Sequence, residues 1–236
     1  MYYPYGYYYG FDWTYLYLVL PCILLSLWAS HNVNATFNKY SKQYSRRGIT
    51  GALAAERVLR ANGVTSVRIE RVGGNLTDHY DPKTNVIRLS DAVYDSNSVA
   101  AAGVAAHEAG HAVQYALGYA PIKIRGAIYP VCNIGSKLAI PLVMFGFLFS
   151  FYYLIDLGII FFALALLFQL VTLPVEFNAS RRAINALSEF GILSSEDEVK
   201  GAKKVLFAAA MTYVTSFLVS LAQLLRLLAL ANRRRR

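Results

Sequence analysis

Residues 138–176 read LAIPLVMFGFLFSFYYLIDLGIIFFALALLFQLVTLPVE and set the architecture of this chain. They contain two uncharged apolar runs, residues 138–155 and 157–175, with Asp156 between them. Each run is close to the ~20 apolar residues that a membrane-spanning helix requires. Because so little separates the runs, we predict a membrane hairpin whose tip near Asp156 lies across the bilayer from Glu176.

The composition of the whole chain is that of a polytopic membrane protein. Of the 236 residues, 56% are hydrophobic and only 16% are charged, and the mean hydropathy is +0.37. Two further uncharged stretches are long enough to span, one between Asp12 and Lys39 and the other at residues 205–225. We therefore expect about four hydrophobic helices, two of which form the hairpin.

Basic residues cluster on one side of the predicted spans. They follow the first span, precede the second, and lie between the third and the fourth: Lys39, Lys42, Arg46, Arg47, Lys123, Arg125, Arg181, Arg182, Lys200, Lys203 and Lys204. By the positive-inside rule, residues 37–127 face the cytoplasm and the N-terminus lies outside. A complete fourth span would put Arg233–Arg236 outside. Either the longer loops outweigh this tail, or the last helix is re-entrant, interfacial or bent at Arg226.

The net charge of +9 does not indicate a nucleic-acid-binding protein. The positive charges cluster beside apolar spans and no nucleic-acid motif lies among them, so anionic lipid headgroups are the expected partners. The Tyr-rich tail at residues 1–12 is of low complexity and carries no assigned chemistry. Cys22 and Cys132 lie in or beside spans, which favours neither a disulfide framework nor thiol catalysis.

An HExxH motif lies in the stretch AAGVAAHEAGHAVQYAL, inside a helix predicted over residues 98–118. Residues four apart share one helix face, so His107 and His111 can bind the same metal ion. Glu108 falls beside this pair, where it can take a proton from the attacking water. An ordinary amphipathic helix is the alternative. Two of the four histidines in the chain lie here among Ala and Gly residues, which favours a metal site.

The third metal ligand follows by elimination. A metzincin requires Gly and His at the positions of Gln114 and Leu117, so that class is excluded. The first acidic residues after the motif are Asp156 and Glu176, and the hairpin places Asp156 on the wrong side of the membrane. Glu176 is therefore the expected ligand of a gluzincin-type site, with Glu189 as the fallback. Two imidazoles and one carboxylate suit zinc, so we expect one Zn²⁺ per chain.

The soluble region contains a helix, short strands and the HExxH helix, in that order. Thr50 caps a predicted helix that ends at about Arg60, VTSVRIERV alternates as a strand does, and residues 84–90 form a further strand. This order is typical of zincin peptidases, in which a substrate strand pairs with the edge of the sheet. We predict that this edge is formed by Val86, Ile87, Arg88 and Leu89.

The expected fold is mainly α. It is a polytopic membrane protein with about four hydrophobic helices and a small zincin-like α+β catalytic region that carries a short β-sheet. The predicted segments are a Tyr-rich tail (1–12), a membrane helix (13–36), the cytoplasmic region (37–127), the hairpin (128–175), a helix with the third ligand and a linker (176–204), a last membrane helix (205–231) and a basic tail (232–236).

Four segments together resemble the YugP-type neutral zinc metallopeptidases, a family of prokaryotic integral membrane proteins. They are HEAGHAVQ, LTDHYDPKTNVIRLS, PVEFNASRRA and AAAMTYV, and the resemblance covers nearly the whole chain apart from the Tyr-rich tail. It implies a membrane-embedded zinc endopeptidase of the prokaryotic cell membrane, distantly similar to HtpX-like proteases.

The HtpX-like proteases carry HExxH and then ExxAD after a membrane hairpin. Here the second motif reads Glu176-Phe177-Asn178-Ala179-Ser180. Ser180 thus replaces the acid that orients a zinc histidine in that pattern. Ser180, Asn178 and Asp78 are the candidates for this supporting role.

His79 and Tyr213 are further candidates for the site. His79 either stabilises the transition state or serves as an alternative third ligand, or else it bonds Asp78 or Asp81 within a hairpin. The phenol of Tyr213 can donate to an oxyanion, although packing is the commoner role of Tyr in a membrane helix.

The expected function is hydrolysis of peptide bonds in membrane or membrane-proximal proteins, with protein or peptide substrates. One alternative is a catalytically inactive membrane scaffold with a residual metal site. The other is a zinc hydrolase of a small amphiphile. The sequence indicates no oligomeric state.

Overall fold

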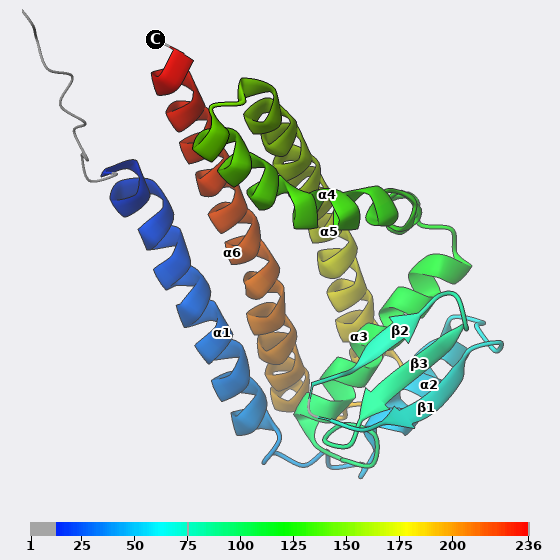
Figure 1. Ribbon diagram of the computed structural model, residues 1–236. Coiled ribbons are helices and arrows are strands. Elements are labelled where there is room, and N and C mark those ends of the chain that lie inside the picture. Colours follow the sequence, from blue (N-terminus) through cyan, green and yellow to red (C-terminus); the bar gives the residue numbers. More distant parts are fainter. Residues whose placement is uncertain (1–12, 75, 236) are drawn as a thin grey trace, which may run out of the picture.

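The computed structural model describes residues 13–74 and 76–235, so the Tyr-rich tail at residues 1–12 lies outside the described residues. Long helices form a bundle, and a small α+β region lies at one end of it (Figure 1). The elements are a π-helical turn Tyr15–Val19, α1 Leu20–Tyr40, α2 Gly51–Ala61, β1 Arg68–Val72, β2 His79–Asp81, β3 Val86–Ser90, α3 Val99–Ala116, α4 Ala120–Phe149, α5 Tyr152–Glu189 and α6 Glu196–Arg235. The predicted mainly α fold with a short sheet is confirmed.

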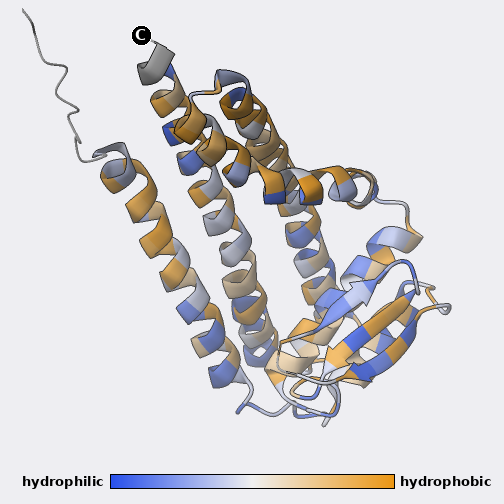
Figure 2. Ribbon diagram, in the orientation of Figure 1, coloured by the Kyte–Doolittle hydropathy of each residue, from blue (hydrophilic) through white to orange (hydrophobic). Residues whose placement is uncertain are grey.

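Four helices of the described chain are long and apolar enough to cross a membrane: α1 with the turn before it, α4, α5 and α6. Apolar residues are dense on these helices, whereas the sheet carries polar and apolar residues side by side (Figure 2). Large apolar side chains face outward, including those of Leu148 and Tyr153, which are 72% and 90% exposed. In a membrane, lipid tails surround such side chains, so they need no other protein segment to remove them from water.

The helices α4 and α5 form the predicted hairpin, but its turn lies earlier than expected. The chain reverses at Ser150 and Phe151 rather than near Asp156, which already lies within α5. The reversal needs a backbone in the left-handed region, and Ser150 adopts it with φ of 59°. At Gly158 the two helices approach so closely that a Cβ atom would lie 2.8 Å from the carbonyl oxygen of Ala139.

The later helices are longer than the predicted spans. α5 continues without interruption past Glu176, so the third span and the ligand-bearing segment are one helix. α6 is likewise uninterrupted at Arg226, whose guanidinium carbon lies 5.1 Å from the ring centroid of Tyr15 near the start of α1. The end of α6 therefore lies at the end of the bundle opposite the sheet (Figure 1).

The strand order of the sheet is β1-β3-β2. β3 pairs in parallel with β1, where Arg68 is opposite Val86, and antiparallel with β2, where His79 is opposite Arg88. The prediction that residues 84–90 form the free edge is therefore wrong, because both sides of this strand are already hydrogen-bonded. The correction applies to Val86, Ile87, Arg88 and Leu89. The free edge nearer to α3 belongs to β2.

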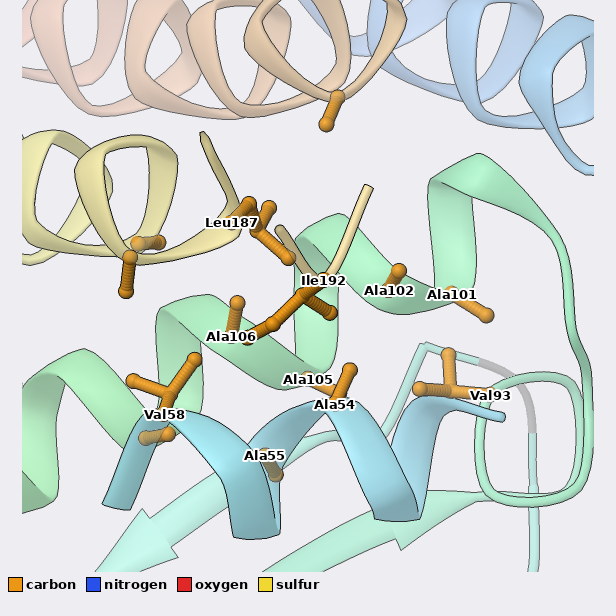
Figure 3. Packing of buried hydrophobic residues seen from close by; sticks show 14 of the residues in the cluster. Ala54, Ala55, Val58, Val93, Ala101, Ala102, Ala105, Ala106, Leu187 and Ile192 are labelled. Carbon is orange, nitrogen blue, oxygen red and sulfur yellow. The ribbon is translucent and has the colours of Figure 1, made fainter. Parts of the chain in front are cut away.

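The helix α3 is the centre of the soluble core and packs between α2 and α5. Its N-terminus is capped by Ser98, whose hydroxyl accepts the backbone N–H of Ala101 at 3.1 Å. Small side chains let the helices pack closely around it (Figure 3): Ala54, Ala55, Ala101, Ala102, Ala105 and Ala106 are fully buried. Further along α3, a Cβ atom on Gly110 would lie 2.8 Å from the carbonyl oxygen of Ala179 in α5.

We predict that Gly110→Ala destabilises the protein although alanine favours helix formation. The added methyl group pushes α3 away from α5, and overpacking of this kind costs about 1–3 kcal/mol. Gly103→Ala on the same helix is the matched control, because its Cβ atom would make only an ordinary contact with Ala202 Cβ, at 3.4 Å. Thermal unfolding in detergent should show a lower midpoint for Gly110→Ala alone. Equal midpoints for the two variants would contradict the proposed tight contact.

Candidate metal centre

Two histidines of α3 and one glutamate of α5 meet at the end of the bundle. The Oε2 atom of Glu176 lies 3.3 Å from Nε2 of His107 and 3.6 Å from Nε2 of His111. Ligand atoms of all three residues lie within 4.8 Å of one another, and among the described residues no other group of three His, Cys, Asp or Glu side chains does so. The structure thus brings together the three ligands expected from the sequence.

The donor set fits a zinc ion. Two ligand atoms that each lie 2.0–2.2 Å from a tetrahedral zinc are about 3.3–3.6 Å apart, which agrees with the distances from Glu176 to the two histidines. Three protein ligands of the nitrogen and oxygen type are also the number that catalytic zinc sites use. The two distances from Glu176 to the histidines and the type of the three ligands therefore both fit zinc.

Only one carboxylate of α5 reaches the histidines. Asp156 lies more than five turns before Glu176, and Glu189 lies more than three turns after it, which correspond to about 30 Å and about 20 Å along the helix. Glu189 is exposed at the end of α5, whereas Glu176 is 2% exposed. The fallback residue Glu189 is therefore too far from His107 and His111 to share a metal ion with them.

Each imidazole uses its other ring nitrogen in a hydrogen bond. Nδ1 of His107 lies 3.2 Å from the hydroxyl of Ser180, and Nδ1 of His111 lies 3.0 Å from Oε1 of Gln114. These contacts hold both rings so that their Nε2 atoms face Glu176. Supporting bonds of this kind orient metal-binding histidines and select their tautomer. Ser180 therefore occupies the place expected for the missing acid.

The sequence assigns Gln114 no role beyond excluding a metzincin, yet its amide links the metal centre to α5. This side chain is fully buried, and its Nε2 donates to the carbonyl oxygen of Val175 at 2.8 Å and to Oδ1 of Asn178 at 3.0 Å. Asn178 thus contributes to the centre through Gln114. In the sequence, the signal for this role of Gln114 is its position three residues after His111, on the same face of the helix.

Arg125 near the start of α4 is a second residue that the sequence does not single out as part of the site. Its Nη1 lies 3.4 Å from Oε1 of Glu176, the oxygen that is not shared with the histidines. The signal is weak in the sequence, because a basic residue just before a span is an ordinary feature of membrane proteins. In the structure it provides a positive charge beside a buried carboxylate.

A cavity of about 540 Å³ opens in front of the metal centre, and it is bordered by β2 and by the helices α3 to α6. Glu108 lines it and is 9% exposed. His79 and Tyr213 line it as well, although neither belongs to the cluster of three ligands. Nδ1 of His79 lies 2.8 Å from the carbonyl oxygen of Thr77.

Asp78 has a structural contact rather than a contact with the metal ligands. Its carboxylate accepts the backbone N–H of Ser90 at 2.8 Å and the Ser90 hydroxyl at 3.0 Å. These bonds attach the segment before β2 to the end of β3. Of the three candidates for the supporting role, only Ser180 contacts one of the two candidate ligand histidines directly.

Among the ionisable groups that line the cavity, His111 and Asp81 have shifted pKa values. Burial lowers the pKa of His111, but the hydrogen bond with Glu176 and the charges of Glu108 and Glu176 outweigh burial, so the pKa lies above its ordinary value. A metal ion binds the neutral imidazole, so binding weakens as the pH falls. At the cavity rim, hydrogen bonds from the Thr84 hydroxyl and the Lys83 backbone lower the pKa of Asp81 to about 2.

Comparison with known proteins agrees with this geometry. Residues 15–232 match the family described as "Putative neutral zinc metallopeptidase". The chain belongs to this family. It is 47% identical to the "Putative membrane protease YugP" of Bacillus subtilis (strain 168) over 212 residues. The aligned region covers 90% of this chain and 94% of the relative. No solved structure matches the chain significantly.

The family membership confirms the resemblance seen in the sequence. A zinc metallopeptidase family implies zinc as the metal and peptides or proteins as the substrates of this metallopeptidase. The name of the relative and the four apolar helices indicate a membrane protein.

We predict that Gln114→Ala lowers zinc affinity about 10–100-fold, as loss of a bond that orients a metal ligand typically does. The His111 ring loses its Nδ1 partner, and α3 loses a polar link to α5. The affinity is measured by competition with a zinc chelator, and Asn185→Ala, which changes an exposed amide of α5, is the control. Unchanged affinity in Gln114→Ala would show that packing alone positions the ring.

Proposed function

We propose that this protein is a membrane-embedded, zinc-dependent endopeptidase that cleaves peptide bonds of membrane or membrane-proximal proteins. The observation that carries the proposal is the convergence of His107, His111 and Glu176, whose ligand atoms lie within 4.8 Å of one another in a cavity that Glu108 also lines. The family supports peptides or proteins as the substrate class.

The chemistry is hydrolysis by an activated water. Zinc, when bound by the three ligands, acts as a Lewis acid that lowers the pKa of water and polarises a carbonyl group. Glu108 follows His107 on α3 and faces the same cavity. As general base it takes a proton from the attacking water, and it then delivers this proton to the leaving amine. A structural metal site has no need of such a base, which argues against the scaffold alternative.

The substrate backbone pairs with β2 in this proposal. β2 pairs only with β3 among the described strands, and the segment from Asp78 to Lys83 lines the cavity. An extended peptide added to this edge passes in front of α3, where the packing of Tyr80 against Tyr115 supports the strand. A free edge beside the ligands favours a peptide over a small amphiphile, which cannot use backbone pairing.

Tyr213 of α6 and His79 of β2 both line the cavity in front of the metal centre. We assign Tyr213 the role of a donor to the oxyanion that forms during hydrolysis, because a phenol donates without carrying charge. His79 lies on the strand that binds the substrate backbone, so it contacts the substrate rather than the metal.

The catalytic end of the bundle faces the cytoplasm in this proposal, because basic residues gather there. Four of them, Lys39, Lys200, Lys203 and Lys204, line a groove of about 480 Å³ between α1 and α6. Lysines at the end of membrane helices attract anionic lipid headgroups. The end of α6 then lies outside, and the basic residues near the metal centre outweigh those of the C-terminal tail.

We predict that Glu108→Gln retains zinc but loses hydrolysis by a factor of about 10²–10⁴, the usual contribution of general acid–base catalysis. Glu176→Ala is the contrasting variant, because it removes a ligand and should lose zinc together with activity. Metal content by mass spectrometry and casein cleavage are measured on the same detergent-purified samples. Residual cleavage at the wild-type rate in Glu108→Gln would remove this residue from the mechanism.

We predict opposite accessibility for the sheet and the hairpin tip. In a background without Cys22 and Cys132, a membrane-impermeant maleimide should label Tyr153→Cys in intact cells, because this side chain lies at the tip and is 90% exposed. Lys83→Cys in the exposed turn after β2 should react only after lysis. The reverse pattern would show that the catalytic region lies outside the cell.

A further inference from the structure

A second cavity, of about 220 Å³, reaches the same metal centre. Like the first cavity, it is lined by His107, Glu108 and Glu176. The rest of its wall differs in character, because it comes largely from apolar residues of α1, α3 and α6. They include Val33, Phe37, Val104, Val205, Leu206 and Ala209.

The two cavities differ in the chemistry they offer to a substrate. The first contains charged and polar groups of the β2 segment and of α4, including Asp81, Lys83 and Arg125. The second has no Lys or Arg in its lining, and its acidic groups belong to the metal centre or, in Asp78, bond Ser90. An apolar cavity of about 150 Å³ is large enough to bind benzene. A volume of 220 Å³ therefore accommodates the side chain of Leu or Phe.

The apolar cavity adjoins the surface of the bundle. A groove of about 320 Å³ between α5 and α6 shares Ser180, Leu206 and Ala210 with it. The groove is bordered by Phe177 and Phe207, which are 43% and 61% exposed on the helices that span the membrane. Arg181 and Lys203 also line the groove, so a largely but not wholly apolar groove at the lateral surface adjoins the cavity at the metal centre.

We infer that the second cavity is the specificity pocket of the peptidase, and that it binds a large apolar side chain next to the scissile bond. The substrate segment enters from the membrane side, between α5 and α6. This inference rests on the proposed peptidase function. A small side chain leaves part of the pocket unfilled, and an acidic one is buried beside the carboxylates of the centre without a Lys or Arg partner.

Ala209 on α6 limits the depth of this pocket. It lines the apolar cavity, is partly buried and carries only a methyl group. A larger residue at this position occupies the space that the substrate side chain needs. Val33 lines the same cavity from α1, so truncation of Val33 enlarges it.

The test uses zinc-loaded, full-length protein in detergent and a set of peptides that differ at one position, with Ala, Leu, Phe or Asp there. The cut sites are read by mass spectrometry and kcat/KM is measured for each peptide. We expect the wild type to cut next to Leu and Phe at least about tenfold better than next to Ala, because a single methylene in an apolar pocket already changes kcat/KM by about 10–200-fold. Cleavage next to Asp should be lower still.

Variants then assign the preference to this cavity. Ala209→Leu should lower the Leu-to-Ala ratio of kcat/KM at least about tenfold, and Val33→Ala should raise the Phe-to-Leu ratio. Ala229→Leu, at a partly buried alanine of α6 outside the cavities described, is the control and should leave both ratios unchanged. Zinc content is measured on every sample, so that a folding defect is recognised.

The outcomes separate this inference from the proposed function. Cleavage by the wild type without preference for Leu or Phe overturns the specificity pocket but not the peptidase, and this holds even where a variant fails to fold. A preference that Ala209→Leu leaves intact in a zinc-loaded protein also overturns it. A wild type that holds zinc and cuts none of the peptides, nor casein, overturns both.

Discussion

The contact of the Glu176 carboxylate with two imidazoles is the interaction on which the site depends. This carboxylate is 2% exposed, and a buried carboxylate is costly unless a cation or a metal neutralises it. Its partners His107 and His111 come within reach only because α3 and α5 pack closely where Gly110 meets Ala179. Helix packing and ligand geometry are therefore a single constraint, and a change that separates the helices also opens the centre.

The membrane hairpin explains how a ligand so far along the chain reaches the HExxH helix. α4 crosses away from the catalytic region, the chain reverses at Ser150, and α5 returns as one uninterrupted helix that carries Glu176. The same helix supplies Ser180 and Asn178, which support the two histidines directly or through Gln114. A spanning helix thus contributes both one candidate ligand and bonds that orient the other two. The metal centre is in this way attached to the apolar part of the bundle.

Two cavities of different character meet at this centre, and their position follows from the same arrangement. The polar one lies beside β2, which pairs only with β3 among the described strands. The apolar one lies beside α1 and α6, where lipid-facing helices provide aliphatic walls. Ser180 lines the apolar cavity and also contacts His107, so a side chain bound there lies next to a group that orients a metal ligand.

Local patterns in the sequence determined much of this protein. The spacing of His107 and His111 fixes a shared helix face, the length of the apolar runs fixes the spans, and counting spans selects Glu176 over Asp156. These inferences hold because helix periodicity and the length of an apolar run are local properties of the sequence, and the bilayer has a known thickness. Only the tertiary structure decided that β3 lies between β1 and β2, because strand alternation is the same for central and edge positions. Only the tertiary structure likewise revealed the contacts of Gln114 and the apolar cavity, because both arise where side chains from helices distant in sequence meet.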